Sequence, residues 1–249
     1  MSFWDHLEEL RGNLFRSLAA FLVCAVALFC CKKLLFDGIV LAPLRPDFIT
    51  YKLLGIDFKM TVINIEISTQ FFVHLKVAGA AGLIVSFPYL VFELWKFISP
   101  ALYKNEKLAI TGAFGFAGVL FYIGVLVGYF LVLPVCLQFF ADYSVSDSIE
   151  NKISLTSYIS LFMSMVLMIG VVFEFPTVVM VLSKLGLITK KTLRKYRRHA
   201  IVAVLIVSAI ITPADPGSML ILAAPLYLLY EFSIFICRKD VEAEDEAKE

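Results

Sequence analysis

Glu174 is the acidic residue of the chain that stands in the most unusual surroundings. It lies in the run Val171–Pro176, and no other charged residue occurs from Ile153 to Ser183. A carboxylate in the middle of a membrane helix costs ~2.5 to 3.5 kcal/mol on insertion scales. We therefore predict that Glu174 faces the interior of a helix bundle or a water-filled cavity. The alternative is a hydrogen bond that packs helices beside a kink at Pro176.

Two other acids, Glu9 and Glu106, lie in polar segments that border apolar runs. Taken alone, both acids fit the interpretation of ordinary solvated surface residues.

Enzyme, metal and cofactor signatures are absent from the sequence. It has no H-E-x-x-H, no G-x-S-x-G and no nucleotide-binding G-x-x-x-x-G-K-[ST] motif. The five cysteines lie in or beside apolar runs without a C-x-x-C pair, and the three histidines are isolated. We predict no catalytic residues, no metal and no cofactor. Glu231, near the end of the last apolar run, is explained by its side chain reaching toward water.

The composition places these residues in a membrane protein. Of 249 residues, 60% are hydrophobic and 17% charged, against about 25% charged in a soluble domain. The sequence predicts an all-α, polytopic domain over residues 1–239 with six transmembrane helices, followed by a disordered acidic tail at 240–249. The six spans are Ser17–Phe36, Phe71–Leu94, Leu108–Phe140, Tyr158–Leu182, Ala200–Ile211 and Met219–Cys237.

The basic residues predict the orientation. With the N-terminus in the cytoplasm, 15 Lys and Arg residues fall in inner segments and six in outer loops, so both termini should be cytoplasmic. The block Lys184–Arg198 is then a topology anchor near anionic lipid, or alternatively a partner site.

Because Met1–Asn13 is polar and carries acids, we expect no cleavable signal peptide. Leu7, Leu10 and Leu14 share a helical face that should dock the N-terminal segment on the membrane surface.

Several features predict the shape of the bundle. The third span is longer than a ~30 Å hydrocarbon core and should tilt, bend near Pro134 or protrude. The last two apolar runs are short, the last because Glu231 interrupts it. The long loop Lys32–Thr69 should form an ordered external cap. Seven glycines between Gly79 and Gly128 give small-residue faces, including a G-x-x-x-G at Gly124 and Gly128.

Five motifs, in order along nearly the whole chain, resemble the TatC family, the multispanning receptor of the twin-arginine protein translocase. They are His6-Leu7-Glu8-Glu9-Leu10-Arg11, Ala42-Pro43-Leu44, Trp95–Tyr103 followed by Glu106, Phe173-Glu174-x-Pro176 and Thr212-Pro213-x-Asp215. The chain departs from the family pattern at Gly12-Asn13, where a basic residue is frequent, and at Ala214 and Met219.

The resemblance implies a Sec-independent translocase subunit of the inner membrane that binds twin-arginine signal peptides of folded proteins and scaffolds the translocon, driven by the proton-motive force. It implies single-span partners resembling TatA and TatB, self-association, contact with lipid and no nucleic acid. The implied signal-peptide site comprises Glu9, Glu106, Phe97, Pro100, Tyr103, Lys104, Leu10 and Arg11. A second group of functional residues comprises Glu174, Asp215, Pro43 and Pro176.

Two other classes of function compete with this one. A proton-coupled carrier of small solutes would use Glu174 and Glu231, although the chain shows no internal repeat. An intramembrane enzyme would need a nucleophile or a metal set that the sequence does not display.

Overall fold

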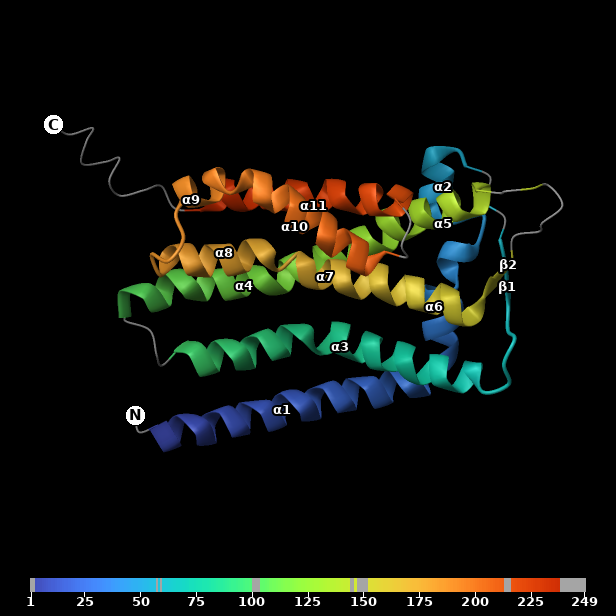
Figure 1. The fold of residues 1–249 in the computed structure, drawn as a ribbon. Coiled ribbons are helices and arrows are strands. Elements are labelled where there is room, and N and C mark those ends of the chain that lie inside the picture. Colours follow the sequence, from blue (N-terminus) through green and yellow to red (C-terminus); the bar gives the residue numbers. More distant parts are fainter. Residues whose placement is uncertain are drawn as a thin grey trace.

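The computed structural model describes residues 3–56, 58, 60–99, 104–143, 146, 152–212 and 216–237, with backbone only for residues 3–6, 104–110 and 113. Most of these residues are helical, and the long helices run roughly along one axis of the molecule (Figure 1). The α-helices of the bundle are α1 (Phe3–Cys30), α3 (Thr69–Ile98), α4 (Lys104–Val127), α5 (Leu133–Asp142), α6 (Leu155–Met163), α7 (Ile169–Val172), α8 (Phe175–Lys184), α9 (Lys190–Lys195), α10 (Arg197–Ile211) and α11 (Pro216–Ile236). The remaining elements are η1 (Leu34–Val40), η2 (Ala42–Leu44), α2 (Ile49–Leu54), β1 (Thr61–Ile63), η4 (Gly128–Val132), β2 (Lys152–Ser154) and η5 (Ser164–Met168).

Five helical segments are long and apolar enough to cross a membrane, among the residues that the structure describes. They are Leu7–Cys30, Thr69–Ile98, Phe114–Asp142, Leu155–Lys184 and Pro216–Ile236. The prediction of a helical, multispanning chain is thus confirmed in its general form. Helix α10 has 15 residues, or about 22 Å at 1.5 Å per residue, so a sixth crossing stays a prediction.

Two sequence expectations about the ends of the bundle are wrong. The N-terminal segment is not a separate surface helix, because α1 continues without a break from Phe3 to Cys30. The last helix is not short: α11 has 21 residues and continues through Glu231. The side chain of Glu231 accepts a hydrogen bond from Arg197 Nη2 at 2.7 Å and so does not interrupt the helix as a lone charge would.

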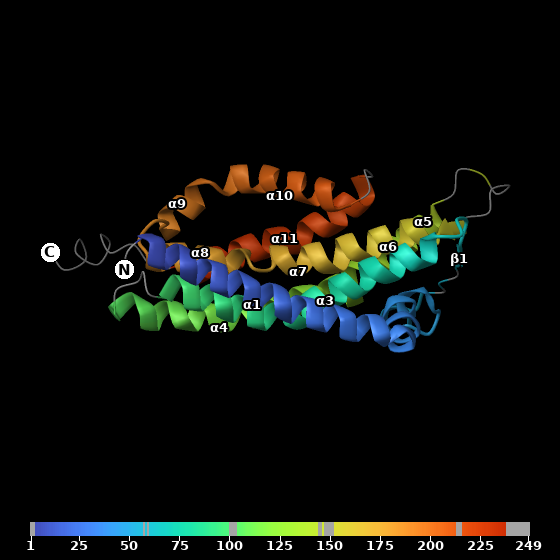
Figure 2. The ribbon, with the colours of Figure 1, turned by 90° about the horizontal axis from the view of Figure 1, so that it is seen from below.

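Helices α1 and α3 lie side by side at one edge of the bundle, and α10 and α11 pack together at the other (Figures 1 and 2). A glycine allows the first pair to approach closely. A Cβ atom built on Gly82 would lie 2.7 Å from the Cα of Ala25, closer than any side chain tolerates. Because α1 packs mainly on α3, many of its large apolar side chains are exposed, as those of a lipid-facing helix are.

Helix α4 and the turn η4 that follows it pack on α7 and η5 through the predicted G-x-x-x-G pair, Gly124 in α4 and Gly128 in η4. A Cβ atom at Gly124 would lie 2.6 Å from Phe173 Cβ, and one at Gly128 would lie 2.5 Å from the carbonyl oxygen of Met165. The other glycines of α4, at positions 112, 115 and 118, have nothing within 4 Å of such an atom. Close approach therefore uses two of the five glycines in the third span.

Two prolines inside the bundle, Pro88 and Pro134, release backbone carbonyls that side-chain hydroxyls from neighbouring elements satisfy. Pro88 in α3 cannot donate to the carbonyl of Ile84, which accepts the hydroxyl of Tyr122 instead, at 3.2 Å. Pro134 follows the π-helical turn η4 and frees the carbonyl of Phe130, which accepts the hydroxyl of Thr50. These bonds replace the helical ones in a region without water.

The cap predicted from the first long loop is folded, and it lies at one end of the bundle (Figure 1). It contains η1, η2, α2 and β1, and β1 pairs in parallel with β2, Thr61 opposite Lys152. Hydroxyl groups join this cap to the bundle: Tyr158 donates to the carbonyl of Val40, and Tyr129 donates to that of Ile39 at 2.8 Å.

Within the cap, the Tyr51 side chain is buried and stacks on Phe58, with ring centroids 4.5 Å apart. Its hydroxyl donates to the carbonyl of Pro43 at 2.9 Å. Burial raises the pKa of Tyr51 above its ordinary value. The phenol is therefore a neutral donor that fixes α2 against η2.

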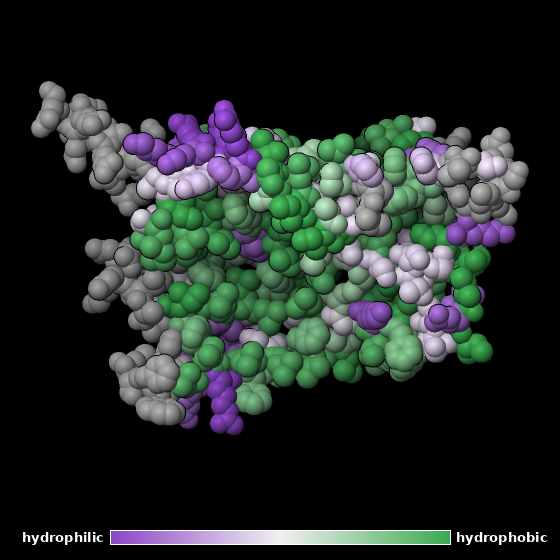
Figure 3. Space-filling view, in the orientation of Figure 1, coloured by the Kyte–Doolittle hydropathy of each residue, from purple (hydrophilic) through white to green (hydrophobic). Residues whose placement is uncertain are grey.

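Polar residues gather at the two ends of the molecule. The start of α1 and the end of α11 lie at one end, opposite the cap (Figures 1 and 2). Figure 3 shows hydrophilic residues near both ends, including the basic segment α9, and a broad hydrophobic zone between them. The predicted disordered tail lies outside the described residues.

Candidate functional site

The segments that carry the predicted signal-peptide residues lie at the end opposite the cap. They are the first turns of α1, the last turn of α3 and the first turn of α4 (Figure 1). On α1, the side chain of Glu9 is partly buried, whereas that of the preceding Glu8 is exposed. Leu10 and Arg11 are exposed, and the guanidinium carbon of Arg11 lies 5.6 Å from the ring centre of Phe15 on the same helix.

The other members of the predicted site are described less completely. Phe97 is partly buried in the last turn of α3. Lys104 and Glu106 are in the first turn of α4, where the structure gives the backbone alone. Pro100 and Tyr103 lie outside the described residues. The backbone thus brings the segments of Glu9, Phe97 and Glu106 to the same end of the molecule.

An ion pair that sequence reasoning missed lies next to this end, between α1 and α3. The Nε atom of Arg16 lies 3.1 Å from Oε1 and 3.2 Å from Oε2 of Glu93. The hydroxyl of Tyr89 donates to Oε1 of the same carboxylate at 2.8 Å. The Nη2 atom of Arg16 donates to Oδ1 of Asn13. Glu93 is 3% exposed, so this carboxylate is buried and fully engaged.

A signal for Glu93 was present in the sequence. It is an acid inside the predicted span Phe71–Leu94, four residues after Tyr89, so the two side chains share a helical face. The argument that drew attention to Glu174 applies equally to it. The partner Arg16, at the start of the first span, had been counted only as a charge that sets the orientation.

Glu174 lies at a break in the fourth span. Helix α7 ends at Val172 and α8 begins at Phe175, with Pro176 in the first turn of α8. The Oε1 atom of Glu174 is buried and has no hydrogen-bond partner among the described residues, and the same is true of Thr177 Oγ1. The break therefore positions an unpaired carboxylate oxygen inside the apolar part of the bundle.

The remaining predicted residues lie elsewhere. Pro43 is buried in the cap, where its carbonyl accepts the hydroxyl of Tyr51. Asp215 lies outside the described residues. Glu231 accepts hydrogen bonds from Arg197 and, at 2.9 Å, from the hydroxyl of Tyr227. Its carboxylate is thus engaged within the chain.

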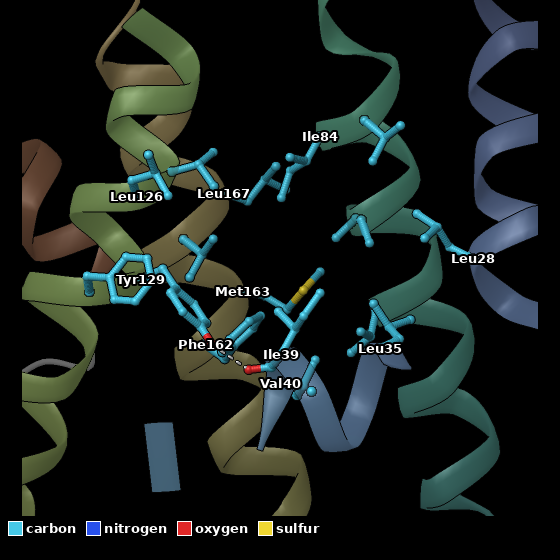
Figure 4. Close-up of a pocket in the computed structure, with 18 residues that line it drawn as sticks. Leu28, Leu35, Ile39, Val40, Ile84, Leu126, Tyr129, Phe162, Met163 and Leu167 are labelled. Atoms are coloured by element: carbon cyan, nitrogen blue, oxygen red, sulfur yellow. Dashed lines mark hydrogen bonds between the residues drawn. The ribbon is translucent and has the colours of Figure 1, made fainter. Parts of the chain in front are cut away.

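Several apolar grooves open on the bundle, and two of them lie along α3. One, of about 460 Å³, lies beneath the cap between α3, η4 and α6, and Figure 4 shows Leu35, Ile84 and Phe162 around it. The dashed line in that view is the hydrogen bond from the Tyr129 hydroxyl to the Ile39 carbonyl, so both of these polar groups in the lining of the groove have a partner. The second, of about 520 Å³, runs along α1 and α3 from Leu14 and Leu90 to Lys76.

Comparison with known proteins agrees with this arrangement. The family model of the Sec-independent protein translocase protein TatC matches residues 5–225. The TatC protein of Blattabacterium from Periplaneta americana (strain BPLAN) is 38% identical, over 95% of this chain and 94% of that protein. The TatC protein of Aquifex aeolicus (strain VF5) is 34% identical, over 95% of this chain and 94% of that protein.

Solved structures give the same result. A crystal structure of the twin-arginine translocase receptor TatC has a TM-score of 0.77 and 34% identity, covering 93% of this chain and 97% of that one. A second, in the detergent DDM, has a TM-score of 0.79 and 33% identity, covering 94% and 99%. The chain therefore belongs to the TatC family and is a multi-pass membrane subunit of a Sec-independent protein translocase, a transport protein and not an enzyme.

Proposed function

We propose that this protein binds twin-arginine signal peptides of folded proteins at the cytoplasmic face of the inner membrane. Glu9 and Glu106 accept the two guanidinium groups, and Phe97, Pro100 and Tyr103 shape the same surface. Leu10, Arg11 and Lys104 complete it. The observation that carries the proposal is that α1, α3 and α4 bring the segments of Glu9, Phe97 and Glu106 to one end of the bundle.

The orientation of the proposed receptor has both termini in the cytoplasm and α10 as a sixth, short crossing. The basic segment α9 and the start of α1 lie at the same end in Figure 1. Retention of basic residues in the cytoplasm favours this sidedness. The cap then faces the outer side of the membrane, away from the signal site.

The apolar part of the signal peptide lies along the concave intramembrane face near Glu174. The open groove on α1 and α3, which Glu174 does not line, supports the beginning of this path, because one end of the groove is formed by Leu14 and Leu90, close to the proposed arginine site. Its lining is almost wholly apolar, which suits the hydrophobic segment of a signal peptide.

The chain also acts as a scaffold. It recruits single-span subunits resembling TatA and TatB and associates with further copies of itself, and the proton-motive force drives passage of the cargo. The absence of a nucleotide-binding motif in the sequence agrees with an energy source outside this subunit.

Photocrosslinking tests the proposed site. A photoreactive residue at position 97 should crosslink a signal peptide with two arginines and not the peptide with two lysines. The double substitution Glu9→Gln and Glu106→Gln should abolish this crosslink while the protein still inserts. Glu8→Gln is the matched control, because Glu8 is the exposed neighbour of Glu9. Unchanged crosslinking in the double variant would contradict the proposal.

A further inference from the structure

The partners of Arg16 form a ready-made receptor for a guanidinium group. We call Glu93, Tyr89 and Asn13 the guanidinium cradle. Its carboxylate faces Nε of Arg16 at 3.1 and 3.2 Å, and the hydroxyl of Tyr89 donates to Oε1 of that carboxylate at 2.8 Å. Asn13 accepts from Nη2. Two nitrogens of one guanidinium are therefore bound at once, a geometry that an ammonium group does not reproduce.

Two members of the cradle, Glu93 and Asn13, are buried, but its occupant is not. The side chain of Glu93 is 4% exposed and that of Arg16 is 45% exposed. The route from the surface to the carboxylate therefore runs along the arginine side chain itself. If that side chain left, another guanidinium could enter by the same route without unpacking α3.

The cradle also contains a polar atom that the chain itself does not satisfy. Asn13 is 4% exposed, and its Nδ2 atom has no acceptor among the described residues. A buried donor without an acceptor is costly. An extended peptide offers backbone carbonyls as acceptors, so a bound peptide would satisfy the donor that Arg16 leaves free.

The position of the cradle relates it to the proposed signal site. Glu93 precedes Phe97 by four residues, one helical turn of about 6 Å on the same face of α3. Arg16 follows Glu9 by seven residues, so the two side chains share a face of α1, two turns or about 10 Å apart. The cradle thus lies one to two turns further into the bundle than the proposed arginine site.

We propose that the guanidinium cradle is a second arginine-binding site of the receptor, occupied by the chain's own Arg16 until a signal-peptide arginine displaces it. The inference rests on the proposed function for the identity of the peptide. It assigns to Glu93 a direct contact with the ligand, and to Arg16 the role of a competitor built into the chain.

The cradle itself is tested without any signal peptide. In the full chain, Arg16→Ala should lower the midpoint of thermal unfolding, and methylguanidinium should restore much of the loss where methylammonium at equal concentration does not. The double variant Arg16→Ala with Glu93→Gln should show no such difference. An equal response to both cations, or one that persists without the carboxylate, would overturn the assignment of the cradle.

Displacement is tested with peptides. The wild-type chain and Arg16→Gln, both in nanodiscs, are titrated with fluorescent signal peptides that carry two arginines or two lysines. Arg16→Gln should bind the arginine peptide about tenfold more tightly, the effect of one added charge-assisted hydrogen bond, and the lysine peptide no more tightly than before. Adding Glu93→Gln should remove the gain. Unchanged or weaker binding of the arginine peptide to a folded Arg16→Gln protein would refute displacement.

The two proposals fail separately. If Glu9 and Glu106 are not the signal site, their double substitution leaves arginine-peptide binding intact. The methylguanidinium response of Arg16→Ala does not depend on that result, because it is measured without a peptide. If displacement is wrong, the arginine peptide still depends on Glu9 and Glu106, but Arg16→Gln gives no gain. Each result identifies the proposal that it contradicts.

Discussion

The hydroxyl of Tyr122 on α4 donates to the carbonyl oxygen of Ile84 on α3, and this is the carbonyl that Pro88 deprives of its helical partner. The proline and the tyrosine are 34 residues apart in the chain, yet they act on one backbone group. In the apolar part of a membrane protein, a carbonyl without a donor is costly, so the two residues should be energetically coupled.

Tyr122→Phe should therefore destabilise the protein by about 1 kcal/mol, the usual loss for one intramolecular hydrogen bond. The same substitution should cost less in a Pro88→Ala background, because the backbone N–H of alanine then donates to Ile84. A double-mutant cycle on the free energy of unfolding in detergent measures the coupling. Equal costs in both backgrounds would show that the hydroxyl does not replace the missing helical bond.

The packing of α4 on α7 gives a second prediction. Gly124→Ala should destabilise the protein by about 1 to 3 kcal/mol, as overpacking does, because the new methyl group would meet Phe173 Cβ at 2.6 Å. Gly118→Ala is the matched control on the same helix, with nothing within 4 Å of its Cβ. The control should be neutral or stabilising, since alanine favours helix over glycine. Thermal unfolding of the two variants in one detergent decides the matter; similar losses would contradict the proposed contact.

The cap should be sensitive to alkaline pH through Tyr51. Burial raises the pKa of this phenol in the folded protein above its unfolded value of 10.0. A raised pKa means that the folded state favours the protonated form, so the stabilising contribution is complete below about pH 10 and is lost as the pH rises through the folded pKa. The bond from Tyr51 to the Pro43 carbonyl is lost with the proton.

Tyr51→Phe provides the comparison for this titration. It removes the hydrogen bond at all pH values, so its stability should be lower at pH 8 and should fall less above pH 10 than that of the wild type. Hydrogen exchange of α2 and η2 reports the cap locally. A parallel alkaline loss in both proteins would assign the pH dependence to other groups.

The sequence predicted the features that depend on local pattern, and it missed those that depend on partners distant in the chain. Apolar runs located the long helices, since a bilayer imposes a length on each. The last helix was predicted short because Glu231 was read as a bare charge, and its partner Arg197 lies 34 residues earlier. Glu93 was overlooked although Tyr89, four residues earlier on the same helical face, was visible in the sequence. The residue that neutralises Glu93, Arg16, becomes its partner only in the fold.

Glycine positions show the same limit. The sequence predicted close helix packing at all five glycines of the third span, but only Gly124 and Gly128 lie against α7 and η5. Spacing alone does not determine which face of a helix meets a neighbour and which meets lipid. The break at Glu174, by contrast, was visible in advance, because Pro176 cannot donate a helical hydrogen bond.

Glu174 gives the last prediction, in which stability and function should change in opposite directions. Its Oε1 atom is buried without a hydrogen-bond partner among the described residues. Glu174→Leu removes this polar group and should raise the free energy of unfolding by about 1 to 3 kcal/mol, the cost of an unsatisfied buried group. If the carboxylate serves the translocation cycle, export of a folded twin-arginine cargo should fall in the same variant.

Glu174→Gln is the control, because it keeps the shape and hydrogen-bonding capacity of the side chain but not its ability to ionise. A leucine variant that is both less stable and fully active in export would show that Glu174 is a packing residue held by contacts in the bundle, and the unpaired oxygen would then have no functional meaning.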